Sequence, residues 1–344
     1  MCIRDRYQLR RDPRVVEALE RMWPVLTPAQ LLRDLFGSKA LISSAASEHL
    51  SEEDWLTLFR PRGESLSGYR WSDADVPLLD EAYLGLGPRL DRQRKARDPE
   101  VRTFGHIVVD ETQDHTPMAL RMIARRSLNG SMTIVGDIAQ ATAPGAAADW
   151  DEVLNHLPSG GKEPRVRELT LSYRIPAPNL ELANKVLAFA APDLSPPTAV
   201  RSVGAPPRII EVRDSAGTSV EQLVERSVAI VEEESEALGG GSVAVIAPES
   251  LIDLVDAALK ARSIDYGRAT TASRNVSGPL HPKIALVPVQ LVKGLELDGT
   301  VVIEPATILD EEPQGLRALF VALTRSTKRL AVVHARSLPD VLQD

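Results

Sequence analysis

The sequence of 344 residues predicts an α/β protein with parallel sheets, preceded by a helical part. Residues 106–109 form a short apolar run that ends on charged residues, as a buried parallel strand does at its carboxyl end. Beyond residue 207, apolar runs alternate with helical patterns, which is typical of βα units. Before residue 104, the apolar spacing is helical and Gly and Pro separate the pieces.

Composition narrows the class of protein. A hydrophobic content of 43% and a charged content of 26% are ordinary for a globular chain, and the length suggests about two domains. No apolar run approaches the roughly 18 residues of a membrane span, so no membrane contact is expected. The single cysteine excludes an internal disulfide, and the scattered histidines give no pattern for a structural metal.

The net charge of −8 is unevenly distributed. Basic and acidic residues balance over 1–103, so the acidic excess falls on 104–344. An acidic surface does not favour the phosphate backbone of a nucleic acid, although a local basic groove can override the mean. Nucleic-acid binding must therefore be inferred from motifs.

The first part, 1–103, is expected to be a helical subdomain that ends an insertion. Its first six residues show no relation to the helical pattern after them and are expected not to be native. A basic cluster between Arg89 and Arg97 is more typical of a solvated helix face than of a nucleic-acid site. Thr27 and Ser51 are predicted N-caps. Helices are predicted over 15–23, 28–36, 51–59 and 76–86.

The strand over His106–Val109 runs directly into Asp110 and Glu111, followed by Gln113 and Asp114. Ligands of open α/β sheets lie beyond the carboxyl ends of strands, so this acidic pair is placed for a metal and for general-base work on a water. The alternative is structural, with Asp114 as the N-cap of a helix from Pro117. That alternative explains Asp114 but neither of the paired carboxylates.

Two further predicted strands end on polar residues. The strand over 131–135 leads into the segment 136–140, and Gln140 can reach the space of Glu111 if the two strands are neighbours. The strand over 166–171 leads to Arg174, which suits a phosphate oxygen or, more simply, a surface ion pair. A helix over 176–189 and a Pro-rich joint come next, and this joint is the clearest candidate domain boundary.

The remaining chain alternates strands and helices and carries two polar segments between them. The first is Lys293-Gly294-Leu295-Glu296, and the second is Val321-Ala322-Leu323-Thr324-Arg325, which alone indicates only an amphipathic helix. Together the alternating units predict a second parallel sheet covered by helices. Strands are expected over 208–212, 242–247, 284–289, 300–303 and 330–334, and helices over 219–238, 251–261 and 315–324.

Five of these segments, in this order, resemble motifs of UvrD/Rep-type superfamily 1 helicases. The resemblance covers roughly two thirds of the chain. It implies RecA-like P-loop NTPase cores, with a partial first core over 104–200 and a complete second core over 201–344. The matching segments are Asp110-Glu111-Thr112-Gln113-Asp114, Gly136–Gln140, Ser172-Tyr173-Arg174, Lys293–Asp298 and Val321–Arg325.

The resemblance also implies ATP and Mg²⁺ as cofactors and a role for each matching residue. Asp110 and Glu111 would hold the metal, with Glu111 also the general base. Gln140 would sense the γ-phosphate, while Arg174 and Arg325 would contact phosphate oxygens. The remaining implied nucleotide contacts are Gln113, Lys293, Gly294 and Glu296, the last on the ribose.

Two departures from the family pattern are visible. The 344 residues contain no Gly-x-x-x-x-Gly-Lys-[Ser/Thr] loop, so we expect a C-terminal part of a longer motor, inactive by itself. Ala141-Thr142-Ala143 stands where DNA-translocating relatives carry an aromatic that stacks on a base, which puts base stacking there in doubt.

Within the family, the segments 71–80, 136–142 and 171–178 look most like actinobacterial HelD-type proteins, ATPases that bind RNA polymerase and release it from nucleic acid. This resemblance implies RNA polymerase as a partner, DNA as a further one, and a cytoplasmic location. Two alternatives stay open: a UvrD/Rep-type DNA helicase that unwinds in the 3′–5′ direction, and a non-catalytic RNA polymerase-binding module.

Overall fold

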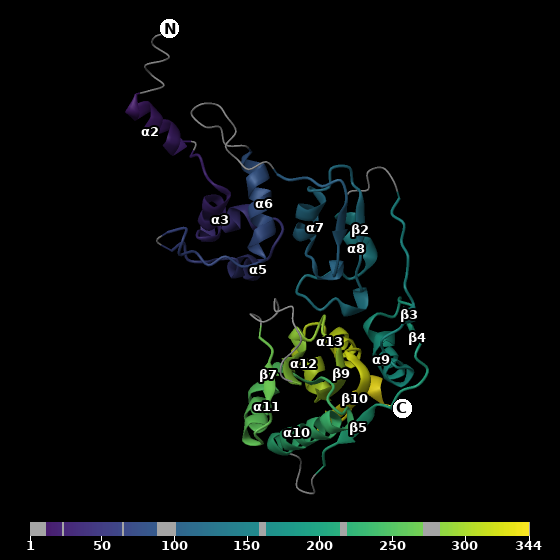
Figure 1. The fold of residues 1–344 in the computed structure, drawn as a ribbon. Helices are drawn as coiled ribbons and strands as arrows, with labels where there is room; N and C mark the ends of the chain where they lie inside the picture. Colours follow the sequence, from purple (N-terminus) through teal and green to yellow (C-terminus); the bar gives the residue numbers. More distant parts are fainter. Residues whose placement is uncertain are drawn as a thin grey trace. The chain divides into compact units, whose positions relative to one another are not determined.

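The computed structural model describes residues 12–22, 24–63, 65–87, 101–157, 163–213, 219–270 and 283–343 (Figure 1). The first six residues and the basic cluster from Arg89 to Arg97 lie outside these ranges. The chain forms two compact units. The helical unit comprises Met1–His106 and Met118–Ser131, and the sheet unit comprises Ile107–Pro117 and Met132–Asp344.

Among its described residues, the helical unit contains the four helices predicted before residue 104, one helix that was missed, and the helix expected from Pro117. The missed helix, α4, is short and rich in Ser and Ala, so it shows little apolar periodicity. The predicted N-cap at Thr27 is confirmed as a capping box, in which Thr27 Oγ1 accepts from Gln30 N at 3.0 Å. Ser51 likewise accepts from Asp54 N at 3.2 Å. The helices are α2 (Pro13–Met22), α3 (Pro28–Phe36), α4 (Lys39–Ala46), α5 (Glu52–Thr57) and α6 (Asp75–Leu86), followed later by α7 (Pro117–Ala124).

Two acids, the buried Asp75 and the half-buried Asp80, stabilise the helical unit beside its small apolar core of Leu32, Phe36 and Ala82. Asp75 accepts two hydrogen bonds from the Arg60 guanidinium, at 2.7 and 2.8 Å. These bonds, with further ones from Ser72, lower the pKa of Asp75 to about 2. Asp80 accepts from Arg125 and Arg126 at 3.0 and 2.6 Å.

The sheet unit begins with a parallel pair of strands, β1 (Ile107–Val109) and β2 (Met132–Ile134). Both were predicted at these positions. The pair continues past its ends, because Val135 N donates to Val109 O at 2.8 Å and Thr112 N donates to Val135 O at 3.1 Å. The two strand ends are therefore neighbours, as the placement of Gln140 near Glu111 requires.

The larger sheet has six strands, and every pairing in it is parallel. Its order is β5-β10-β9-β6-β8-β7, which confirms the predicted second parallel sheet. Strand β7 was not predicted, because its three residues, Tyr-Gly-Arg, form no apolar run. The strands are β5 (Arg208–Glu211), β6 (Val243–Ala247), β7 (Tyr266–Arg268), β8 (Ile284–Pro288), β9 (Leu297–Ile303) and β10 (Ser326–His334).

Helices cover both faces of this sheet. Alternate residues of β6 point to opposite faces, so that Val243 and Val245 pack in one apolar cluster while Ala244 and Ile246 pack in the other. The first cluster includes residues of α10 (Val220–Ala237) and α11 (Glu249–Ala261), and the second includes residues of α9, α12 and α13; these helices are labelled in Figure 1. The helices of the second face are α9 (Ala177–Ala190), α12 (Pro305–Glu311) and α13 (Gly315–Leu323).

Helix α9 precedes the Pro-rich joint, yet its residues Ala183 and Val186 are fully buried in the core of the six-stranded sheet. The predicted domain boundary near residue 200 stays a prediction. What the packing establishes is that the segment leading from Arg174 into α9 is anchored on the larger sheet.

The predicted strand over 166–171 is wrong for most of its length. Only Leu171–Ser172 (β3) is extended with a partner, the two-residue strand β4 (Thr198–Ala199). A strand needs a neighbour for its backbone hydrogen bonds. Leu169, apolar in the pattern, is 91% exposed. Among the described residues, no helix is both long and apolar enough to cross a membrane.

Candidate functional site

The acidic turn after β1 has an unusual backbone at Glu111. Its φ of 49° and ψ of 38° place a residue with a side chain in the left-handed region. The carboxylate of Asp110 is exposed and accepts from Glu111 N at 2.8 Å. A 3₁₀ turn over Thr112–Asp114 comes next. Asp114 lies inside that turn and does not cap α7, so the structural alternative for this residue is wrong.

Gln113 is fully buried and joins the ends of β1 and β2. Its Nε2 donates to Glu111 Oε2 at 2.7 Å, and its Oε1 accepts from Asp137 N at 3.0 Å. A Cβ on Gly136 would lie 2.3 Å from Gln113 Oε1. Glycine at 136 is therefore what lets the Gln113 amide approach the second strand end and orient Glu111.

Gln140 ends the 3₁₀ turn Ile138–Gln140, which Asp137 caps. Its Nε2 donates to Asp137 Oδ2 at 2.7 Å, and its Oε1 accepts from Arg325 Nη2 at 3.1 Å. Both ends of the amide are thus fixed. A carboxylate that follows the two-stranded β1–β2 sheet, the smaller sheet of the site, holds one end, and a cation that precedes β10 of the larger sheet holds the other. Ala139 beside it is buried in the same apolar core as α13.

Lys293 brings a second cation to the site, beside the carboxylates of Glu111 and Asp114, and its side chain is only 10% exposed. Nζ donates to Asp114 Oδ2 and to Gln140 O, both at 2.8 Å, and lies 3.4 Å from Glu111 Oε2. The next residue, Gly294, has a φ of 78°. The structure therefore gives Gly294 a backbone role, the tight turn after Lys293.

Arg325 lies between α13 and β10 and is 8% exposed. It donates from Nε to Val321 O at 3.0 Å and from Nη2 to Thr324 Oγ1 at 3.1 Å. Burial, aided by the nearby positive charge of Arg174, lowers the pKa of Arg325 to about 10, although the charges of acidic neighbours oppose this shift. The guanidinium is still protonated at neutral pH.

Arg174 and Glu296 form an ion pair at the outer side of the site, with exposed side-chain fractions of 66% and 53%. Arg174 follows β3, and Glu296 immediately precedes β9. Glu296 and Arg325 therefore lie at the amino ends of their strands, whereas Asp110 and Glu111 follow the carboxyl end of β1. The rule that ligands lie beyond the carboxyl ends of strands therefore explains the site residues that follow β1 and β2, but not those that precede β9 and β10.

The structure brings most of the predicted residues into one network. Direct contacts link Glu111, Gln113, Gln140, Lys293 and Arg325. Asp110 adjoins Glu111, and Arg174, which pairs with Glu296, lies within electrostatic range of Arg325. Their roles toward a nucleotide stay predictions.

Sequence reasoning did not assign a site role to Asp137, nor to Asp114 as the partner of Lys293. It also missed Arg317, which donates to Ala141 O, directly after Gln140, at 3.5 Å and to Ala148 O at 3.2 Å. Every residue has a backbone carbonyl, so a contact to one does not require any particular residue type at that position. Such a contact therefore leaves no sequence pattern that could have revealed it.

The carboxylates suit magnesium bound together with a phosphate. No group of three or more His, Cys, Asp or Glu side chains that could hold a metal occurs in the described ranges. Magnesium does not need one, because it binds through one or two carboxylates plus waters and phosphate oxygens. Asp110, exposed at a strand end, and Glu111 beside it fit this mode and would hold the ion, which would neutralise phosphate charge.

No protein-family model and no curated protein matches the chain. Among solved structures, the C-terminal domain of a possible DNA helicase from Lactobacillus plantarum WCFS1 matches with 21% identity and a TM-score of 0.37, over 50% of this chain and 92% of that one. Arterivirus nonstructural protein 10, a helicase in complex with DNA, matches with 14% identity and a TM-score of 0.34, over 67% of this chain and 40% of that one. The chain is similar to these helicases at low TM-scores, so a functional assignment has to rest on the site residues.

Proposed function

We propose that the network around Glu111 and Arg325 is the ATP-hydrolysis site of a helicase-like motor of the UvrD/Rep superfamily, built on RecA-like cores. The observation that carries the proposal is the Gln140 amide, held at one end by Asp137 of the smaller sheet and at the other by Arg325 of the larger sheet. A motor needs a site that spans two sheets, so that the state of the nucleotide can change their contact.

Each residue has a role in this proposal. Glu111, oriented by the Gln113 amide, accepts the proton of the attacking water. Asp110 and Glu111 would hold magnesium, which would neutralise phosphate charge. Arg174 and Arg325 stabilise the charge of the transferred phosphoryl group. Gln140, which contacts residues of both sheets, senses whether that phosphoryl group is bound. Three residues complete the nucleotide contacts: Lys293, Gly294 and Glu296.

The test uses a protein that carries residues 1–344 together with a phosphate-binding loop, since these residues contain none. Glu111→Gln should bind ATP as before and lose hydrolysis, because an amide can hold the water but cannot take its proton. Arg325→Ala should lower turnover by about 10³-fold or more. The control is Arg336→Ala, at an exposed arginine that pairs with Asp310. Unchanged turnover in Glu111→Gln would remove Glu111 as the base.

We further propose that the motor is of the HelD type and releases RNA polymerase from nucleic acid. In support, Ala141 is fully buried in the position where a stacking aromatic would serve DNA translocation. The chain's net charge of −8 also favours a protein surface over a nucleic-acid backbone. The competing functions are 3′–5′ unwinding of DNA and non-catalytic binding to RNA polymerase.

Two assays with the same purified protein separate these functions. One measures ATP-dependent release of RNA polymerase from a stalled complex, and the other measures strand separation on a forked duplex. Release without unwinding is the expected outcome. Unwinding without release would favour the DNA helicase, and binding to polymerase that does not depend on ATP would favour the non-catalytic module.

A further inference from the structure

Arg201 lies between the two turns that carry the arginines of the site. Its Nη1 donates to Arg174 O at 2.8 Å and to Thr327 O at 2.6 Å. One carbonyl belongs to the first arginine itself, and the other lies two residues after Arg325. A single guanidinium nitrogen, which has two N–H groups, therefore ties both turns together.

The backbone around Arg201 is fixed by its own contacts. Arg201 O accepts from Ala177 N at 2.9 Å, at the start of α9, and Val200 N donates to Ser172 O at 2.9 Å. A Cβ on Gly204 would lie 2.5 Å from Pro176 Cβ, which shows how closely this segment packs on the turn before α9. The backbone of Arg201 is thus held in place, and its side chain extends from there to Thr327.

The turn after Arg325 is held from the same helix. Asn179 and Ser326 are both fully buried, and Asn179 Nδ2 donates to Ser326 Oγ at 2.9 Å. The Arg325 turn is therefore anchored inside the core. The Arg174 turn, by contrast, follows a strand of only two residues and carries a largely exposed side chain.

Holding these turns together works against electrostatics, since two guanidinium groups that lie near each other repel. We propose that Arg201 is a positioning residue, which holds the Arg174 turn on the Arg325 turn so that both cations face one phosphate group. The phosphate part of this inference rests on the proposed function, whereas the tie between the turns does not.

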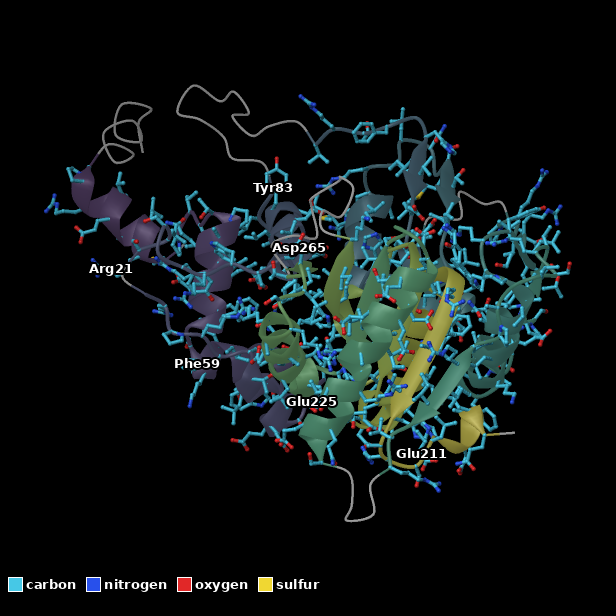
Figure 2. All side chains as sticks on the ribbon, turned by 60° about the horizontal axis from the view of Figure 1, so that its bottom comes forward. Arg21, Phe59, Tyr83, Glu211, Glu225 and Asp265 are labelled. Carbon is cyan, nitrogen blue, oxygen red and sulfur yellow. The ribbon has the colours of Figure 1, made fainter. Side chains whose placement is uncertain are left out.

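Distances between spin labels test, without any nucleotide, whether Arg201 holds the Arg174 turn on the Arg325 turn. The labels replace Tyr173, beside Arg174, and the exposed Glu225 on α10, marked in Figure 2, in a chain with Cys2→Ser. We expect one narrow distance distribution in this parent and a broad one in Arg201→Ala. Arg201→Lys should restore the narrow distribution, because its ammonium can donate to both carbonyls. Arg213→Ala, at another exposed arginine, should match the parent. A narrow distribution in Arg201→Ala would overturn the inference.

Calorimetry with magnesium tripolyphosphate tests the consequence for phosphate. In the protein that carries residues 1–344 together with a phosphate-binding loop, Arg201→Ala should weaken binding about tenfold, which is typical of coupled neighbours, and should have no further effect once Arg174→Ala is present. An equal loss in both backgrounds would mean a general structural effect and would refute positioning. If Arg174→Ala and Arg325→Ala both bind like the unmodified chain, the proposed function fails while the spin-label result still decides the tie.

Discussion

The backbone of Glu111 lies in the left-handed region, where a residue with a Cβ costs about 1 to 2 kcal/mol. Its surroundings hold it there. Gln113 Nε2 bonds the Glu111 carboxylate, and Thr112 Oγ1 donates to Val135 O at 2.9 Å. Strain of this kind concentrates at functional sites. Here it turns the carboxylate out of the strand direction toward Lys293.

Gln113→Leu should destabilise the sheet unit by about 1 to 3 kcal/mol, because it leaves the N–H of Asp137 without its acceptor. Urea unfolding followed by circular dichroism measures the loss. Gln343→Leu, at an exposed glutamine, is the matched control and should change the midpoint little. Equal midpoints for the two variants would show that the buried amide is not needed for stability.

Gly136→Ala should cost about 1 to 3 kcal/mol through overpacking, because its Cβ would collide with the Gln113 amide. Gly105→Ala is the control, since a Cβ there would meet no atom within 4 Å. Comparing the two unfolding midpoints checks the result. A Gly136→Ala chain as stable as Gly105→Ala would mean that Gln113 can move aside freely.

Individual residues were predictable where chemistry requires a side-chain type at a fixed place after a strand. Asp110, Glu111 and Gln140 follow strands that apolar runs reveal, so their positions could be predicted directly. Arg201 and Arg317 were not predictable, because each donates to backbone carbonyls that any residue could supply. Asp114 was assigned a local role because its partner, Lys293, is distant in sequence.

A buried acid links α10 to two strands of the larger sheet. Glu234 on α10 is 1% exposed and accepts from Arg208 of β5 at 2.6 Å and from Arg329 of β10. Burial raises the pKa of Glu234, but the hydrogen bonds from Arg329 and Arg208 outweigh it, so the net pKa lies below the usual range. Glu234 is therefore ionised in the fold and binds two cations.

Glu234→Gln should destabilise the sheet unit by about 3 kcal/mol, because it leaves two partly buried guanidinium groups facing a neutral amide. The adjacent Glu233→Gln is the matched control. Glu233 is exposed and also pairs with Arg208, so it should cost less than about 1 kcal/mol. Chemical unfolding of both variants measures the difference. Similar losses would contradict the role assigned to burial.

Strands and helices could be predicted from the sequence where they are buried on both faces or begin at a capping residue. Strands β6 and β8 are apolar throughout, β10 contains the apolar run Leu330–Val333, and α10 has a capping box at Ser219. The strand over 166–171 was wrong because an apolar pattern does not supply a neighbouring strand. Helix α12 was missed because its seven residues, from Pro305 onward, are too few for a periodicity to emerge.

At the scale of the whole molecule, acid should act on the helical unit through Asp75. Its pKa is about 2 in the fold, against an ordinary value of 3.8, so its stabilisation is complete above pH 4 and is lost as pH falls toward 2. The amount is about 2 kcal/mol. Acid titration of the chain should therefore show a loss of helix in this window.

Asp75→Asn should remove that pH dependence and lower stability at pH 7 by a similar amount, because Arg60 loses its charged partner. Comparing unfolding at pH 7 with unfolding at pH 3 measures both effects. Asp73→Asn, at an exposed acid nearby, is the control. An unchanged pH profile in Asp75→Asn would show that another acid governs the transition.

The chain of residues 1–344, by itself, should not hydrolyse ATP at a measurable rate. Its arginines can act only on a triphosphate already held, and its 344 residues contain neither the loop of backbone N–H groups nor the lysine that would hold one. Phosphate release from purified 1–344, compared with Arg325→Ala, measures this. Turnover that disappears in Arg325→Ala would prove the expectation wrong.

In the proposed function, phosphate at Arg174 would exchange with the carboxylate of Glu296. A phosphate that binds Arg174 takes the place of a carboxylate that is already there, so the gain is the difference between two anionic partners. Added salt weakens the old pair and the new one alike. The affinity for phosphate should therefore depend less steeply on ionic strength than at an unpaired arginine. Glu296→Gln would convert exchange into simple addition and make that dependence steeper.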